Sequence, residues 1–197
     1  MTRSYLVRHG AAGDRHAWHE ADELRPLDEE GRRQAKALVA LLAEAVIERL
    51  LSSPYLRCVQ TLEPLGAARG VPVETTPVLA EGAGGAGAVE LLNRDEALVA
   101  CSHGDVIEEA LDLLAAAGVA LEGRPRGAPQ GAGSRHAGAP QGAGSRHAGA
   151  PQGAGSSSAE TPKGATWVFD LRNGTIVEGV LLPPQAPLKA PGKSPGG

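Results

Sequence analysis

Two apolar runs that each end in a polar triplet constrain the fold more than any other feature of the sequence. Leu6 and Val7 lead into Arg8-His9-Gly10, and the apolar stretch Ala97–Cys101 leads into Ser102-His103-Gly104. Such runs predict short buried strands of a largely parallel sheet. Ligands of open α/β sheets bind beyond the carboxyl ends of the strands, so both triplets are expected at one binding site.

Arg57 occupies the corresponding position after a third predicted strand, at Val46–Ser52. Ser53 suits the N-cap of a helix and Pro54 suits its first position, so a helix is predicted at Tyr55–Arg69. Arg57 is then expected in the first turn of that helix, just past the end of the strand.

The rest of the chain alternates between helix and strand patterns. Asp28 is a good N-cap for a helix with an apolar stripe through Leu38 and Leu42, and Asn173-Gly174 is a strong hairpin signal. We therefore predict a single α/β domain with a mixed, mostly parallel sheet flanked by helices on both faces. Further strands are expected at Gly70–Glu74, Ala165–Leu171 and Thr175–Leu182, and further helices at Ala88–Asn93 and Val106–Ala117.

Three copies of an eleven-residue unit interrupt this pattern between Gly127 and Ala159. The units contain no large apolar residue and so cannot stack into a core. We expect residues 1–182 to form one domain, interrupted by a disordered low-complexity insertion at about 123–160, with a disordered tail at 183–197. The role of the repeats is left open.

Charge and composition exclude several classes of partner. The formal net charge is -4 and no basic stripe is present, so nucleic acid is not expected as a partner. The sequence shows no secretion signal and no run long enough to span a membrane, so a cytoplasmic protein is expected. Cys58 and Cys101 are expected as free, buried thiols. His16 and His19 lack further ligands, and neither a metal nor a cofactor is expected.

Four nitrogen-rich side chains are expected at the same edge of the sheet: Arg8, His9, Arg57 and His103. Such a group suits a tetrahedral dianion, because arginine donates in bidentate fashion to phosphate oxygens and helix N-termini add backbone donors. A neutral imidazole can attack phosphorus in line, and the flanking cations are expected to keep His9 neutral. Positioning and charge neutralisation, the main requirements of phosphoryl transfer, would then need no metal.

Three blocks of sequence resemble the histidine phosphatase superfamily, also called the phosphoglycerate mutase-like family. They are Leu-Val-Arg-His-Gly at Leu6–Gly10, Ser-Ser-Pro-Tyr-Leu-Arg-Cys at Ser52–Cys58 followed by Gln60-Thr61, and Ser-His-Gly at Ser102–Gly104. The resemblance implies that His9 is phosphorylated during catalysis and that Arg8, Arg57 and His103 hold the phosphoryl group. It also implies that Glu81, which matches the position of the family's acid, protonates the leaving oxygen.

Within the superfamily, Asp22–Ala35 resembles SixA-type phosphohistidine phosphatases, and equally the phosphatase domain that follows a Nudix domain in some bacterial nucleotide hydrolases. Lys163–Val168 resembles the second group. The resemblance implies metal-independent hydrolysis of a phosphomonoester or phosphoramidate, with a phosphorylated small molecule or a phosphohistidine protein as substrate. A catalytically weak phosphate-binding regulatory module is the alternative, and the short glycine-rich stretch Glu81–Arg94 argues against a mutase. The oligomeric state is left open.

Overall fold

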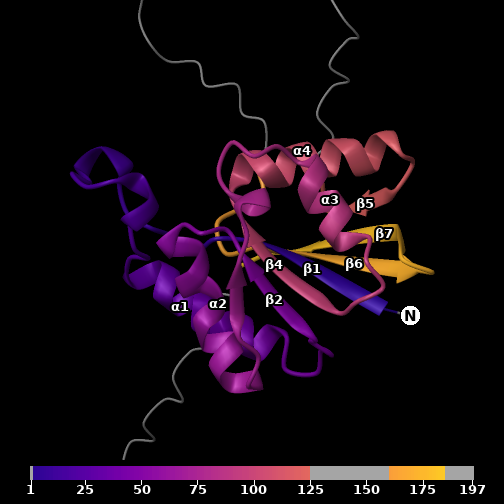
Figure 1. Ribbon diagram of the computed structural model, residues 1–197, viewed down its shortest axis with the longest axis horizontal. Coiled ribbons are helices and arrows are strands. Elements are labelled where there is room, and N and C mark those ends of the chain that lie inside the picture. The colour runs from indigo at the N-terminus through magenta and orange to yellow at the C-terminus, as the bar shows by residue number, and fades with distance from the viewer. Residues whose placement is uncertain (1, 125–159, 185–197) are drawn as a thin grey trace, which may run out of the picture. The chain divides into compact units, whose positions relative to one another are not determined.

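A seven-stranded sheet in the order β3-β2-β4-β1-β6-β7-β5 lies at the centre of the computed structural model, which describes residues 2–124 and 160–184 (Figure 1). Neighbours from β3 to β1 are parallel, β6 is antiparallel to both β1 and β7, and β5 is parallel to β7. The predicted repeat insertion and tail lie mostly outside the described residues. The strands are β1 (Thr2–Arg8), β2 (Arg49–Ser52), β3 (Val73–Thr75), β4 (Leu98–Ser102), β5 (Ala120–Glu122), β6 (Thr166–Arg172) and β7 (Thr175–Leu182).

Helices cover both faces of the sheet (Figure 1). On one face α1 (Glu29–Leu41) and α2 (Leu56–Arg69) enclose a core with β1, β2 and β4. On the other face α3 (Ala86–Leu92) and α4 (Gly104–Ala116) enclose a second core. The predicted fold class is confirmed. Short 3₁₀ turns lie at Arg15–Ala17, Asp22–Leu24 and Pro77–Leu79.

The helices on both faces of the sheet explain the continuous apolar runs in the sequence. In β1, Leu6 points into the core beneath α3 and α4, whereas Tyr5 and Val7 point into the core beneath α1 and α2. Because successive side chains of a strand alternate between faces, a strand buried on both faces must be apolar throughout.

Two local predictions are confirmed in detail. The Asp28 carboxylate caps α1, since its Oδ1 accepts a hydrogen bond from the Gly31 amide at 2.8 Å. Asn173 and Gly174 join β6 to β7 with φ values of 51° and 71°. Positive φ at both central residues is the requirement of a type I′ hairpin turn.

Some element boundaries differ from the sequence prediction, and one strand was not predicted. α2 begins at Leu56 with Tyr55 as its N-cap, so the assignment of Ser53 as the cap was wrong. α4 begins at Gly104, two residues early, because the His103 carbonyl already accepts the Ile107 amide at 3.1 Å. β5 was not predicted, because its three residues are too few to show a period. Among the described helices, none is both long and apolar enough to cross a membrane.

Candidate active site

The carboxyl ends of β1, β2 and β4 meet at one edge of the sheet, as the polar strand ends predict. Arg8 lies opposite Ser102 in the register of β1 and β4, and β2, which ends at Ser52, flanks β4 on its other side. The pairing continues past the strands, since the His9 amide donates to the Ser102 carbonyl at 3.0 Å. The rings of His9 and His103 consequently lie 5.2 Å apart, edge to face.

Burial and one hydrogen bond define the chemical state of His9. Its Nδ1 lies 2.7 Å from the Gly10 carbonyl oxygen, which can only accept, so Nδ1 carries the hydrogen and Nε2 keeps its lone pair. Burial is the main cause that lowers the pKa of His9 to about 3. The Gly10 hydrogen bond opposes this shift, and His103, Arg57 and Arg8 lower the pKa further. His9 is therefore neutral at pH 7, although burial and not the cations is the larger reason.

His103 is held from two sides. Its Nε2 lies 2.8 Å from the Ser53 hydroxyl and 3.5 Å from the Cys58 sulfur. Its Nδ1 lies 3.4 Å from Nη2 of Arg57, a group that only donates, so Nδ1 accepts and Nε2–H donates to Ser53. The Tyr55 ring packs edge-on at 4.7 Å. The hydroxyl that was predicted to cap a helix instead orients the second histidine.

Arg57 is the most deeply buried charge of the site, with 1% of its side chain exposed. Nη1 donates to the Asp22 carbonyl at 2.8 Å and Nη2 to the Glu81 carboxylate at 2.7 Å. The guanidinium also stacks over Tyr55, 4.6 Å from the ring centroid. Its buried Nε has no hydrogen-bond partner among the described residues. A buried donor of this kind is rare in proteins and is available to an acceptor from outside the chain, such as a water molecule or a ligand atom.

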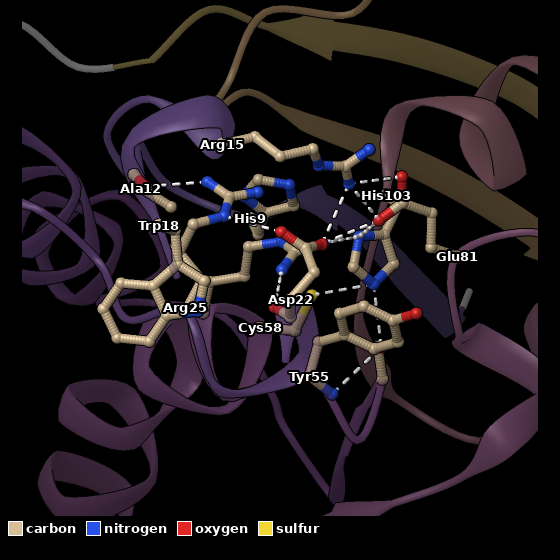
Figure 2. Close-up of polar contacts among 12 residues, drawn as sticks. His9, Ala12, Arg15, Trp18, Asp22, Arg25, Tyr55, Cys58, Glu81 and His103 are labelled. Carbon is tan, nitrogen blue, oxygen red and sulfur yellow. Dashed lines mark hydrogen bonds and ion pairs between the residues drawn. The ribbon is translucent and has the colours of Figure 1, made fainter. Parts of the chain in front are cut away.

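Two carboxylates and two arginines form a closed ring of ion pairs (Figure 2). Arg57 Nη2 pairs with Asp22 at 3.0 Å and with Glu81 at 2.7 Å. Arg15 Nη2 pairs with the same two carboxylates, at 2.9 Å and 2.7 Å. Arg25, which is buried, anchors the ring by donating to Asp22 at 2.8 Å and to the Ala12 carbonyl at 2.7 Å.

Asp22 is held as a carboxylate by this ring. Burial acts to raise the pKa of Asp22, but the hydrogen bond from Arg25 and the charges of Arg57, Arg25 and Arg15 outweigh it and lower the pKa to about 2. The folded state therefore binds a proton at Asp22 less readily than the unfolded chain does.

Replacing Asp22 by Asn is expected to produce a pH-dependent loss of stability. The charged form of Asp22 stabilises the fold fully above its ordinary pKa of 3.8, and this contribution is lost as the pH falls through about 2. The difference in Tm between wild type and Asp22→Asn should therefore be large near neutral pH and shrink in strongly acidic buffer. Thermal unfolding followed by circular dichroism measures it, with Asp112→Asn, at an exposed ion pair with Arg124, as the control. A difference that is constant with pH contradicts the expectation.

The Arg8 guanidinium contacts Thr161 and Gly104. Its Nη1 donates to the Thr161 carbonyl, and a Cβ built on Gly104 would lie 2.8 Å from its Nη2. The guanidinium therefore packs against the first residue of α4, where only glycine leaves it room. Its charge still lowers the pKa of His9.

Of the predicted site residues, the structure brings His9, Arg57, Glu81 and His103 together, whereas the Arg8 guanidinium contacts Thr161 and Gly104. Sequence reasoning missed three residues that hold the group: Arg15, Asp22 and Ser53. Ser53 carried a signal, because it follows directly on a predicted strand. Asp22 and Arg15 lie in a polar loop with no period, and only the folded chain shows that this loop reaches Glu81. Within residues 2–124 and 160–184, no group of three or more His, Cys, Asp or Glu is placed to hold a metal ion.

The fold and these side chains define an α/β protein with a cationic site at its strand ends. The family model of the histidine phosphatase superfamily (branch 1) matches residues 4–96. Within that range the chain resembles this superfamily, and the match contains the first two of the three sequence blocks, at Leu6–Gly10 and Ser52–Cys58.

Individual proteins are also similar to this chain in sequence or in fold. The chain is 38% identical over 109 residues to the 8-oxo-(d)GTP phosphatase of Mycolicibacterium smegmatis (strain ATCC 700084 / mc(2)155), a match that covers 52% of this chain and 34% of that protein. The chain thus spans about a third of the length of this curated relative. The fold is similar to that of the putative phosphohistidine phosphatase SixA from Agrobacterium tumefaciens, with a TM-score of 0.55, 23% identity and coverage of 86% of this chain and 91% of that one. A structure of SixA with tungstate gives a TM-score of 0.54 at 19% identity, covering 92% and 94%.

Proposed function

We propose that this chain is a phosphatase that forms a phosphohistidine on His9 and needs no metal ion. The observation that carries the proposal is the state of His9, which is neutral, has its Nδ1–H held by the Gly10 carbonyl and keeps the lone pair of Nε2. Arg57 and His103 lie beside it and can neutralise a phosphoryl group. The match to the histidine phosphatase family model and the phosphatase among the relatives support the same class of reaction.

The reaction has two halves. First Nε2 of His9 attacks phosphorus, so that an N–P bond forms and the P–O or P–N bond of the substrate breaks. The leaving atom takes a proton from protonated Glu81, and the Gly10 carbonyl stabilises the positive charge that develops on the imidazole. Then water attacks phosphorus, the N–P bond breaks, and the Glu81 carboxylate accepts the proton of the water. Inorganic phosphate and neutral His9 are the products.

Arg8, Arg57 and His103 are the proposed ligands of the phosphoryl group. The Nε–H of Arg57 is buried and lacks an acceptor among the described residues, so a phosphoryl oxygen can fill that role. Nη2 of Arg57 is already bonded to Glu81, at 2.7 Å. A phosphoryl oxygen that binds this nitrogen takes the place of the Glu81 carboxylate, which frees that carboxyl to face the leaving group.

The substrate class is a further part of the proposal. The relative from M. smegmatis is named for its action on 8-oxo-(d)GTP, which supports a nucleoside phosphate as the first substrate to test. A phosphohistidine protein is the alternative, and it rests only on similarity of fold to SixA structures. We expect the reaction to take place in the cytoplasm, and two buried free thiols agree with a reducing compartment.

Trapping the covalent intermediate tests the mechanism. The protein is incubated with an aryl phosphate labelled at phosphorus and quenched rapidly, and the label is expected on the protein in an acid-labile, base-stable form. His9→Ala should carry none. If a folded wild-type protein neither takes up label nor releases phosphate, the proposal fails and the phosphate-binding regulatory module is favoured. Transfer of label between two hydroxyls of one molecule, without net release of phosphate, would identify a mutase.

Glu81→Gln is expected to slow hydrolysis of alkyl phosphates by roughly 10² or more while aryl phosphates lose much less, because an aryl leaving group needs little protonation. The ratio of kcat values for the two substrate types measures this effect. Glu96→Gln is a matched control, since the Glu96 side chain is 29% exposed against 30% for Glu81 and also pairs with an arginine. Equal losses on both substrates, or none on either, would exclude Glu81 as the acid.

A further inference from the structure

The loop that carries Arg15 contributes one side chain to the proposed reaction. We infer that Arg15 is a positioning residue, which holds the Glu81 carboxyl at the outer side of the site while a phosphoryl group occupies Arg57. The inference rests on the proposed function and adds a residue that neither the sequence blocks nor the comparisons indicate. It follows from how the two oxygens of Glu81 are shared.

Glu81 has two arginine partners, and the phosphoryl group competes for only one of them. Oε2 of Glu81 accepts from both Arg57 and Arg15, each at 2.7 Å, whereas Oε1 accepts from Arg15, also at 2.7 Å. A phosphoryl oxygen on Arg57 removes the first partner and leaves both Glu81 oxygens in contact with Nη2 of Arg15. Arg15 therefore decides where Glu81 lies during the reaction.

Exposure shows which end of the ring faces outward. The side chain of Arg57 is 1% exposed, that of Glu81 30% and that of Arg15 52%. The phosphoryl group binds at the buried end and the leaving group departs outward, so a carboxyl held by Arg15 lies on the side where the proton is needed. Figure 2 shows the Arg15 guanidinium and the Glu81 carboxylate next to each other beside His103.

Arg15 can act as a fixed support because its own backbone and second partner are anchored. Asp14 caps the turn that carries it, accepting from the His16 amide at 2.9 Å. The second partner, Asp22, is fixed by buried Arg25. The backbone next to Glu81 is also fixed, since the Gly82 amide donates to Asp105 of α4 at 2.6 Å. The Glu81 side chain lies between these anchors, where it can shift when Arg57 takes up a phosphoryl oxygen.

The test compares Arg15→Ala with wild type on alkyl and aryl phosphates. We expect kcat for alkyl phosphates to fall by roughly 10- to 100-fold, the usual scale of loss for a misplaced catalytic group, with KM and aryl turnover nearly unchanged. Arg15→Ala combined with Glu81→Gln should be no slower than Glu81→Gln alone, and Arg15→Lys should recover part of the loss. Arg33→Ala is the matched control, because Arg33 also bridges two carboxylates, is 46% exposed and lies outside the site.

Two outcomes overturn the inference. A raised KM at constant kcat means that Arg15 binds the substrate itself, and losses that add to those of Glu81→Gln mean that it acts independently of Glu81. Amide hydrogen exchange at residues 80–85 gives a readout without turnover, and exchange should be faster in Arg15→Ala than in wild type or Arg33→Ala. If wild type binds inorganic phosphate but hydrolyses nothing, the proposed function fails. The exchange measurement then tests the positioning role by itself: unchanged exchange in Arg15→Ala overturns that role, and faster exchange supports it.

Discussion

His9→Ala is expected to lower kcat by on the order of 10⁴ or more, because removing the nucleophile of an enzyme with a covalent intermediate leaves only binding and electrostatic contributions. His103 cannot replace it, since its Nε2 is committed to the Ser53 hydroxyl and its Nδ1 faces Arg57. Steady-state release of phosphate from an aryl phosphate measures the effect. Circular dichroism confirms that the variant is folded.

The control for this variant is His19→Ala, which removes an exposed imidazole from the loop before α1. Its kcat should equal that of wild type. A His9→Ala protein that retains a tenth of the wild-type kcat would falsify the assignment of His9 as the nucleophile, whatever the label-trapping experiment shows.

Arg57→Ala is expected to lower kcat by roughly 10² to 10³, the usual cost of losing one donor that stabilises developing charge. Arg57→Lys keeps the charge but lacks the planar fork that bonds the Asp22 carbonyl and a phosphoryl oxygen together, so it should recover little of the lost rate. Phosphate release and the uptake of label by His9 are the measurements for both variants.

Arg57→Ala also leaves two carboxylates without their buried partner, which lowers stability as well as rate. Activity is therefore compared at a temperature where thermal unfolding shows every variant to be folded. Arg49→Ala is the control, because Arg49 likewise pairs with two carboxylates, Glu74 and Glu96, but lies at the opposite end of β2. A folded Arg57→Lys or Arg57→Ala protein with the kcat of Arg49→Ala would remove Arg57 from the mechanism.

The parts of the site that sequence alone predicts are those encoded locally. The apolar run before Arg8 and His9 predicts a strand and places these two side chains at its end. The same holds for His103 after β4. Because parallel strands bring their carboxyl ends to one edge, the gathering of these side chains follows from the fold class.

The parts that sequence could not predict depend on contacts between distant segments. Arg15 and Glu81 are 66 positions apart, and no period in the loop indicates that they meet. Ser53 was misassigned because a serine before a helix usually caps it, whereas here its hydroxyl bonds His103, 50 positions away. The neutrality of His9 was predicted from the neighbouring cations, which are a secondary cause. The main cause is burial, which arises only in the packed chain.

The position of β1 in the sheet also affects how the chain folds during its synthesis. β1 leaves the ribosome before its antiparallel neighbour β6, which begins only at Thr166. Until β6 has been translated, one side of β1 is an open edge of backbone donors and acceptors, of the kind that other chains pair with. The strand that precedes His9 is thus translated well before the strand that covers its open edge, so that newly made chains depend on rapid completion of the β6–β7 hairpin.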